Sequence, residues 1–200
     1  MNTRVIAITG GIGCGKSALC DYFSSQGYPV IDTDRVAKDL VAPQQPGLLA
    51  LIDRLGSDYL TDQGELNRDK LRQTFFTDPQ IKQQVESILH PMVRQTVRER
   101  IEALKTKQAL IFIAIPVLHQ LNQPEYQIDQ VLLVECDPER QLARVTQRDQ
   151  RSQAQIEQII RQQATPEQRR ERADDIIENN GSLAELHQQA ETWLQKIGVK

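Results

Sequence analysis

Short runs with a β-branched, apolar centre alternate along this chain with longer stretches in which apolar positions recur every three or four residues. The short runs favour strands because β-branched side chains suit extended backbone. They predict strands at residues 4–9, 28–32, 109–115, 130–136 and 174–178. The run at 109–115 is apolar at every position, which is typical of a strand buried on both faces of a parallel sheet. Strands separated by helices predict an α/β fold, with the first two strands parallel.

The longer stretches predict helices because their apolar residues fall on one helical face. From residue 43 to 107 the pattern is helical throughout, with no convincing strand, which indicates a helical insertion between the second and third strands. Pro91 interrupts the apolar stripe of its longest helix, so we expect a kink or break near His90. Helices are expected at 16–26, 35–41, 47–55, 67–76, 78–104, 156–163 and 165–172, and from Asp137 and Ser182 onwards.

The residues after the first strand carry the strongest chemical signal in the chain. Gly10 to Ser17 have the spacing G-x-x-x-x-G-K-S, the P-loop pattern, and a predicted helix follows directly. In such a loop the backbone amides form a nest of donors for phosphate at the positive end of the helix dipole. Lys16 is expected to reach the β- and γ-phosphates of ATP, and the Ser17 hydroxyl to ligate Mg²⁺. The predicted ATP-binding residues are Gly11, Ile12, Gly13, Cys14, Gly15, Lys16, Ser17 and Ala18.

Each of these assignments has a structural alternative. The motif could be a glycine-rich turn that carries a lysine by chance, although its strand-loop-helix context argues against this. Cys14 is either a reactive thiol at an anion nest or a small residue that fills the loop, and the second interpretation is favoured. Trp193 falls on the apolar face of the last helix and is expected to pack rather than to bind a ligand.

Two acidic residues follow the second strand, where ligands bind in open parallel sheets. Asp34 could accept a proton from a substrate hydroxyl or hold water on Mg²⁺, and Asp32 is a weaker candidate. The alternative is that Asp34 only caps the helix expected at 35–41. Because the P-loop precedes the same edge of the sheet, the catalytic interpretation is favoured.

A row of arginines follows the fourth strand. Arg140, Arg144 and Arg148 recur every four residues, and Arg151 comes three residues later, so their guanidinium groups share one helical face. Guanidinium groups bind phosphate in a bidentate manner, and a row after a sheet strand suits a lid over a triphosphate. A solvated face, with Glu139 and Asp149 as ion-pair partners, is the alternative.

Composition excludes several classes of function. The formal net charge is −3, so no strongly basic field favours nucleic acid as a partner. The three cysteines match neither a zinc site nor a disulfide framework, which fits a reducing, cytoplasmic location. No apolar run approaches a membrane span, and the N-terminus has no signal-peptide layout. No aspartate ends the run at 109–115 and no Asn-Lys-x-Asp motif occurs, which disfavours a GTPase.

Several motifs in the same order resemble those of the dephospho-CoA kinase family, nearly from end to end of the chain. Residues 9–17 are similar to its T-G-G-I-G-S-G-K-S, 30–34 to its V-I-D-A-D, and 89–91 to its L-H-P. Residues 141–144 and 147–149 are similar to its Q-L-x-R and Q-R-D, 163–164 to its Q-A, and 173–181 to its A-D-D-V-I-x-N-N-G. One departure is Gln120, which stands where the family's P-L-L-x-E carries a glutamate, so no charge-dependent role is carried over there.

The resemblance implies a P-loop nucleoside-triphosphate-hydrolase-type parallel sheet flanked by helices, with a helical substrate-binding insertion and a helical lid. It implies one kinase domain over residues 1–200, with its core at about 1–34, 108–138 and 173–200, the CoA-side insertion at about 35–107 and the lid at about 139–172. The implied reaction is ATP-dependent phosphorylation of the ribose 3′-hydroxyl of dephospho-CoA, the final step of CoA biosynthesis.

The resemblance also implies roles for individual residues. Asp34 is assigned to the substrate hydroxyl, Arg148 to the lid, and Asn179 to the neighbourhood of the adenine of ATP. Together with the motif analysis this gives Asp34, Lys16, Arg144 and Arg148 as catalytic residues, Asp34, Thr9 and His90 as contacts of the substrate, and Ser17 as the ligand of Mg²⁺.

The expected partners are ATP and dephospho-CoA, with no nucleic acid and no membrane, in a monomer or weak homo-oligomer. Two alternatives stay open from the residues themselves. One is a kinase of the same architecture that acts on a nucleoside, a nucleotide or a shikimate-like alcohol. The other is an ATP-dependent switch or assembly protein without a phosphoryl acceptor.

Overall fold

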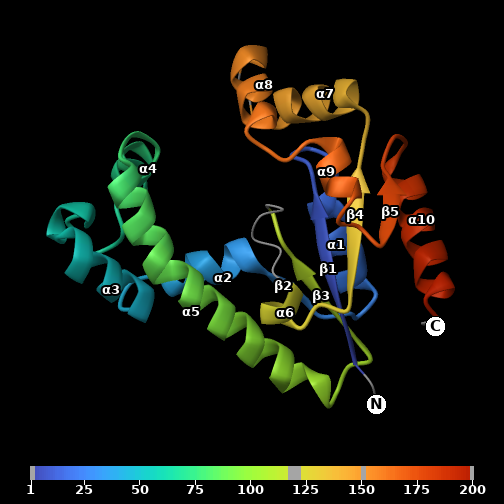
Figure 1. The fold of residues 1–200 in the computed structure, drawn as a ribbon, viewed down its shortest axis with the longest axis horizontal. Helices are drawn as coiled ribbons and strands as arrows, with labels where there is room; N and C mark the ends of the chain where they lie inside the picture. Colours follow the sequence, from blue (N-terminus) through green and yellow to red (C-terminus); the bar gives the residue numbers. More distant parts are fainter. Residues whose placement is uncertain (1–2, 117–122, 150–151, 199–200) are drawn as a thin grey trace. The chain divides into compact units, whose positions relative to one another are not determined.

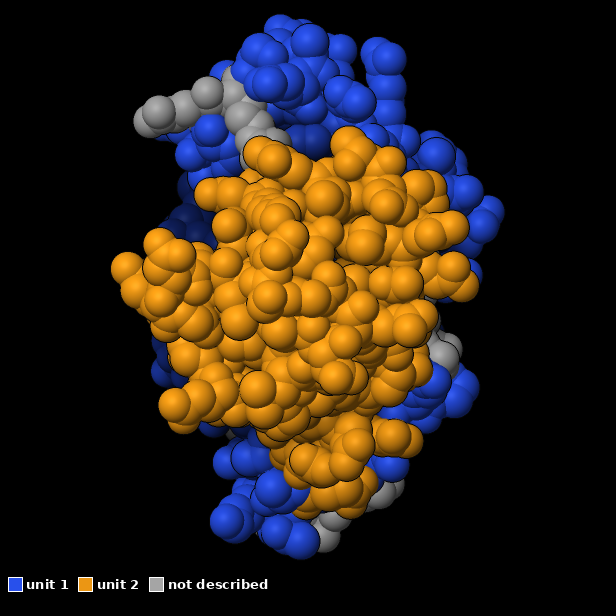
Figure 2. All heavy atoms as spheres, turned by 90° about the vertical axis from the view of Figure 1, so that its left-hand side faces the viewer, with its two compact units in different colours: residues 1–32, 103–200 blue, residues 33–102 orange. Residues whose placement is uncertain are grey.

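The structure is a computed structural model that describes residues 3–116, 123–149 and 152–198. The chain forms two compact units, one from residues 1–32 and 103–200 and the other from residues 33–102. Figure 2 shows these units in blue and orange. The first unit contains the sheet, and the second contains helices. No helix within the described ranges has both the length and the apolarity needed to cross a membrane.

A parallel sheet of five strands, in the order β2-β3-β1-β4-β5, forms the centre of the first unit (Figure 1). Its strands are β1 (Arg4–Gly10), β2 (Val30–Asp32), β3 (Leu110–Ala114), β4 (Gln130–Glu135) and β5 (Asp175–Glu178). All five predicted strands are confirmed, and β1 and β2 are parallel, although β3 lies between them. Because every pair is parallel, the carboxyl ends of the strands share one edge, where such sheets bind ligands.

Helices of the first unit follow the strands. They are α1 (Lys16–Ser25), α6 (Gln123–Tyr126), α7 (Pro138–Asp149), α8 (Gln153–Arg161), α9 (Pro166–Arg170) and α10 (Leu183–Lys196). Capping boxes begin α8, α9 and α10, each with a Ser or Thr at the N-cap and a Gln or Glu three residues later. The helix expected from Ser182 onwards is confirmed as α10, whereas α6 was not predicted.

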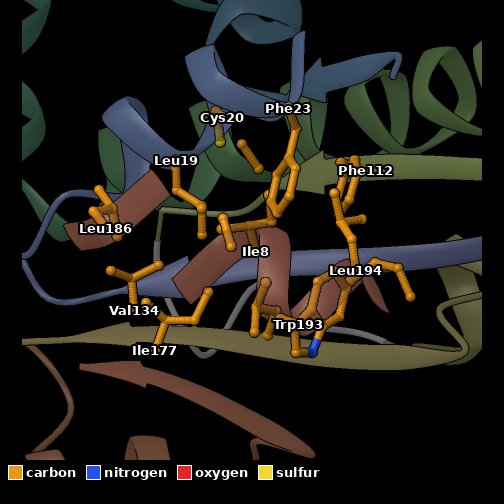
Figure 3. Close-up of a cluster of buried hydrophobic side chains, with 14 of the residues drawn as sticks. Ile8, Leu19, Cys20, Phe23, Phe112, Val134, Ile177, Leu186, Trp193 and Leu194 are labelled. Atoms are coloured by element: carbon orange, nitrogen blue, oxygen red, sulfur yellow. The ribbon is translucent and has the colours of Figure 1, made fainter. Parts of the chain in front are cut away.

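The main hydrophobic core lies where α1 and α10 pack on one face of the sheet (Figure 3). The rings of Phe23 and Phe112 stack with centroids 4.1 Å apart, and Leu19 lies fully buried on the same helix as Phe23. Trp193 is 5% exposed, and its indole Nε1 donates a hydrogen bond of 2.9 Å to Asp175 Oδ2. The prediction that Trp193 packs in the structure is therefore confirmed.

The second unit is helical, as predicted, and has a core of its own. Its elements are α2 (Thr33–Leu40), α3 (Pro46–Leu55), the 3₁₀ turn η1 (Ser57–Tyr59), α4 (Arg68–Thr77) and α5 (Pro79–Lys105), whose last residues belong to the first unit. The core contains Val41, Leu48, Leu51, Tyr59, Leu66 and Val85.

Helix α5 is 27 residues long and continues through Pro91, so, of the kink or break expected near His90, the break is absent. A proline removes one backbone donor, and the apolar stripe continues on both sides of it. At the start of this helix Asp78 acts as the expected cap, because its Oδ1 accepts a hydrogen bond of 2.8 Å from the Gln80 amide.

Candidate functional site

The loop between β1 and α1 is rich in glycine, and neighbouring side chains pack closely around it. Gly13 and Gly15 have φ angles of 75° and 104°, which side chains other than glycine rarely adopt. A Cβ atom on Gly15 would lie 2.2 Å from Asn179 Nδ2, and one on Gly13 would lie 2.5 Å from Val145 Cγ2. Both the backbone conformation and the neighbouring side chains therefore require glycine at these positions.

Three side-chain amides from distant parts of the chain hold this loop. Asn179, which follows β5, donates from Nδ2 to the Cys14 carbonyl at 2.8 Å. Gln141 on α7 donates from Nε2 to the Ile12 carbonyl at 2.8 Å, and Gln163 accepts from the Ile12 amide at 3.0 Å. Both the amide and the carbonyl of Ile12 are therefore hydrogen-bonded to side chains, one on α7 and the other two residues after α8. The sequence analysis quoted Gln141 and Gln163 within motifs but gave them no role.

A buried ion pair lies beside the loop. Arg169 on α9 makes two bonds to Glu135 at the end of β4, from Nη2 to Oε1 at 2.9 Å and from Nε to Oε2 at 3.1 Å. Their side chains are 7% and 3% exposed, and Arg169 also donates to the Ala164 carbonyl. Removing one partner of such a pair typically costs about 3–5 kcal/mol, because the other charge stays buried. This pair therefore fixes the end of β4 against α9.

Two cysteines meet beneath the loop. The Sγ atoms of Cys14 and Cys136 are 2.7 Å apart, and the Cys14 thiol also lies 3.6 Å from Glu135 Oε1. The hydrogen bond with Cys136, followed by burial, raises the pKa of Cys14. The hydrogen bond with Cys14, followed by the Arg144 charge, lowers the pKa of Cys136 despite its burial. Nothing in the spacing of the two residues along the chain predicted this contact.

A cavity of about 280 Å³ opens beside the N-terminus of α1. Its lining is Gly15, Ala18, Arg144, Asn179, Leu183 and Leu186. Arg144 donates to the Asn179 carbonyl at 3.0 Å and to the Gly181 carbonyl at 3.3 Å, so its guanidinium group is fixed at the cavity wall. The cavity combines apolar leucine surfaces with amide and guanidinium groups, a lining that suits a flat heterocycle.

Lys16 and Ser17 begin α1 directly after this loop. Lys16 is partly buried and Ser17 is exposed, so the hydroxyl is accessible at the positive end of the helix dipole. Within the described residues no group of three or more His, Cys, Asp or Glu side chains could hold a metal ion. A divalent cation here would therefore depend on the hydroxyl and on oxygens of a bound phosphate, an arrangement that Mg²⁺ commonly adopts.

The helix that carries Asp34 begins earlier than expected. Helix α2 begins at Thr33 rather than at Arg35, so Asp34 lies inside its first turn. The alternative that Asp34 is the N-cap of this helix is therefore wrong. No loop residue separates β2 from α2, because the strand ends at Asp32 and the helix begins at Thr33. The Asp34 side chain is exposed.

The loop contacts described above do not involve Arg148, Thr9 or His90. Arg148 is exposed and pairs with Asp149, Nε to Oδ1 at 2.6 Å, which matches the solvated alternative for that residue. Thr9 is buried near the end of β1, and His90 is partly buried on α5 in the second unit. Arg151 and Gln120 lie outside the described residues.

Comparisons with known proteins agree with one another. Residues 4–185 match the family model described as dephospho-CoA kinase. The chain is 41% identical over 192 residues to the dephospho-CoA kinase of Hydrogenovibrio crunogenus, which covers 96% of both chains. It is 37% identical to that of Enterococcus faecalis, over 99% of this chain and 100% of the other. The crystal structure of TT1252 from Thermus thermophilus matches 98% of this chain and 99% of its own, with a TM-score of 0.81 at 30% identity.

Proposed function

We propose a function from one premise: the chain belongs to the dephospho-CoA kinase family. It is a kinase that uses ATP to phosphorylate dephospho-CoA on the ribose 3′-hydroxyl, which gives CoA and ADP and completes CoA biosynthesis. The observation that carries this conclusion is sequence similarity to such a kinase, 41% identity over 96% of this chain, combined with a P-loop at the carboxyl edge of a parallel sheet.

The ATP side of the proposal uses the loop and the adjoining cavity. The amides of Gly13, Gly15, Lys16 and Ser17 and the Lys16 ammonium group bind the phosphates at the N-terminus of α1, whereas the Cys14 amide donates to the Gly11 carbonyl at 3.1 Å and helps to shape the loop. The adenine lies in the cavity beside Asn179 and Arg144, between Leu183 and Ala18, because this cavity adjoins Gly15 of the loop. The Ile12 amide is already bonded to Gln163, so we assign Ile12 to the shape of the loop rather than to phosphate binding.

The acceptor side of the proposal uses Asp34. The chain leaves β2 at the edge of the sheet that carries the P-loop, and Asp34 follows the strand by two residues. The 3′-hydroxyl oxygen attacks the γ-phosphorus, the bond to the β-phosphate oxygen breaks, and Asp34 takes the hydroxyl proton. Arg148 is proposed to neutralise the moving charge, with residues 139–172 closing as a lid. Arg144, expected from the sequence to share this role, is proposed to contact ATP at the wall of the adenine cavity, where it bonds the Asn179 and Gly181 carbonyls. The helical insertion, with His90, and Thr9 are proposed to contact dephospho-CoA.

Three finer points complete the proposal. Ser17 would hold Mg²⁺ together with the phosphates, since its exposed hydroxyl is a suitable oxygen ligand at the start of α1. When bound, Mg²⁺ would supply charge stabilisation to the triphosphate. The protein is cytoplasmic, where both nucleotide substrates are available, and it acts as a monomer or weak homo-oligomer.

The direct test is a coupled assay of ADP formation with ATP, Mg²⁺ and dephospho-CoA. The expected result is ADP release that depends on dephospho-CoA, with CoA identified as a product 80 Da heavier by mass spectrometry, the mass that a phosphoryl group adds. The same assay with nucleosides, nucleotides and shikimate tests the alternative acceptors. ATP hydrolysis that is indifferent to dephospho-CoA would instead support a switch or assembly protein and contradict the kinase.

A further inference from the structure

The two cysteines beneath the P-loop form a feature that the proposed reaction does not use. Cys14 comes from the loop, and Cys136 follows β4 by one residue, so the pair joins two elements that are far apart in the sequence. Both thiols are free, with Cys14 fully buried and Cys136 at 8% exposure. At 2.7 Å between sulfur atoms, they are already closer than two unbonded sulfurs ordinarily lie.

We propose that Cys14 and Cys136 are a modification site, a dithiol that hydrogen peroxide converts into a reversible disulfide that weakens ATP binding. The inference concerns nucleotide binding by the loop and does not depend on which alcohol accepts the phosphoryl group. Two thiols and one peroxide give one disulfide and two molecules of water, so the oxidation balances with peroxide alone.

The reaction begins at Cys136, because it is the more exposed of the two sulfurs and because its thiolate is stabilised by the Cys14 thiol and by the positive charge of Arg144. Its thiolate attacks one peroxide oxygen, the O–O bond breaks, and hydroxide leaves to give a sulfenic acid. Cys14 then attacks the Cys136 sulfur, the S–O bond breaks, and hydroxide leaves as the S–S bond forms. Glu135, 3.6 Å from the Cys14 sulfur, can take the Cys14 proton and pass it to the hydroxide, which gives water.

The disulfide would affect the loop because the loop has little room to adjust. A disulfide brings its sulfurs to about 2.05 Å, closer than they are in this structure, so Cys14 or Cys136 must shift. Val145 and Asn179 lie where a Cβ atom on the glycines beside Cys14 would stand, and the Cys14 carbonyl is bound by Asn179. A shift of Cys14 therefore disturbs the amides of its neighbours, which are the proposed phosphate donors.

Cys20 provides an internal control for the oxidation. It is buried in α1, and burial raises its pKa to about 12, so it is expected to keep its thiol under mild oxidation. Of the three cysteines of the chain, one free thiol should then remain after treatment. Cys136→Ser removes the pair while it leaves the loop sequence unchanged.

The experiment treats the purified protein and Cys136→Ser with hydrogen peroxide, removes the peroxide with catalase and measures thiols, peptides and ATP affinity. We expect the wild type to yield a linked peptide that contains Cys14 and Cys136, a fall from three free thiols to one, and about tenfold weaker ATP binding by calorimetry. Dithiothreitol should restore both thiols and affinity. Cys136→Ser should bind ATP equally well before and after peroxide.

Experiments on the wild-type protein alone can contradict the proposal, whether or not Cys136→Ser folds. Three remaining thiols, a link that involves Cys20, or sulfinic and sulfonic acids that dithiothreitol does not reverse would overturn the site. A linked protein with unchanged ATP affinity would overturn its effect on binding. Because binding is measured without an acceptor, failure of the kinase assay leaves these results interpretable.

Discussion

Asp34 is the residue on which the proposed proton transfer depends. In Asp34→Asn the amide can still hydrogen-bond the 3′-hydroxyl but cannot take its proton. We expect kcat to fall by roughly 10²-fold or more, the range found when a general base is lost, while ATP affinity stays near that of the wild type. Steady-state kinetics with dephospho-CoA, alongside ATP binding by calorimetry, measure both quantities.

A suitable control for this change is Asp53→Asn, which removes an exposed carboxylate from α3 of the same unit. The control should retain both kcat and ATP affinity, since it changes the charge of the unit by the same amount. Turnover near the wild-type value in Asp34→Asn would exclude Asp34 as the base. Loss of ATP affinity in parallel with kcat would instead indicate a role in nucleotide binding.

Gly15 and Gly27 stand on either side of α1, and both have positive φ, 104° and 86°. Alanine at either position incurs a strain of about 1–2 kcal/mol, because its Cβ crowds the backbone. The two sites differ in their surroundings, since a Cβ at Gly27 meets nothing within 4 Å, whereas one at Gly15 meets Asn179 at 2.2 Å. We therefore expect Gly15→Ala to weaken ATP binding at least tenfold and Gly27→Ala to leave it unchanged.

Chemical denaturation of both variants separates strain from crowding. A loss of stability that is larger in Gly15→Ala than in Gly27→Ala, with an ATP effect confined to Gly15→Ala, would support the contact between the loop and Asn179. If Gly15→Ala bound ATP as tightly as Gly27→Ala does, the contact between the loop and Asn179 would have no part in nucleotide binding.

At the scale of elements, α7 and the segment after α8 are tied to the P-loop through Ile12. Gln141 donates to the Ile12 carbonyl, whereas Gln163 accepts from its amide. A glutamate can replace the acceptor but not the donor, so Gln163→Glu should preserve its bond and Gln141→Glu should lose it. We expect Gln141→Glu to weaken ATP binding about 5–10-fold more than Gln163→Glu, as the net loss of one hydrogen bond implies.

Both substitutions add one negative charge close to the loop, so the comparison between them cancels most of the electrostatic repulsion of ATP. Gln147→Glu and Gln158→Glu add the same charge at exposed positions of α7 and α8 and should bind ATP as the wild type does. Equal losses of ATP affinity in Gln141→Glu and Gln163→Glu would mean that the added charge, not the hydrogen bond, determines the effect. Calorimetric titration with ATP gives all four affinities.

The elements that sequence predicted well are those with a local signal. The strands were recognisable from short apolar runs, and caps such as Asp78 and Ser182 fixed where helices begin. The four-residue helix α6 has no periodicity to detect. Pro91 does not end α5, so the apolar stripe that continues on both sides of it offsets a cost of about 3 kcal/mol for proline inside a helix.

The parts of the site that sequence did not predict depend on contacts between distant residues. Glu135 and Arg169 are 34 positions apart, and Cys14 and Cys136 are 122 apart, so no spacing rule connects them. The P-loop was predictable because a single local motif contains it. Asn179 was expected near ATP from family resemblance alone, and its bond to the Cys14 carbonyl gives a physical reason for that expectation.

At the scale of the whole molecule, each unit has a hydrophobic core of its own. Leu19 belongs to the core of the sheet unit and Leu51 to the core of the helical unit, and both are 0% exposed. Truncation of a buried leucine to alanine typically costs about 2–5 kcal/mol, through lost burial and the cavity that remains. Leu19→Ala and Leu51→Ala are therefore matched changes in two different cores.

Because separate cores can open separately, we expect each variant to speed amide hydrogen exchange mainly within its own unit. A fall of about 2 kcal/mol in the free energy of opening corresponds to exchange that is about 30-fold faster. Leu51→Ala should raise the KM for dephospho-CoA more than that for ATP, and Leu19→Ala the reverse, if residues 33–102 bind the acceptor. Exchange followed by mass spectrometry and steady-state kinetics test both statements. Faster exchange throughout the chain in either variant would mean that the two units unfold together, and equal changes in both KM values would argue against an acceptor-binding role for the helical unit.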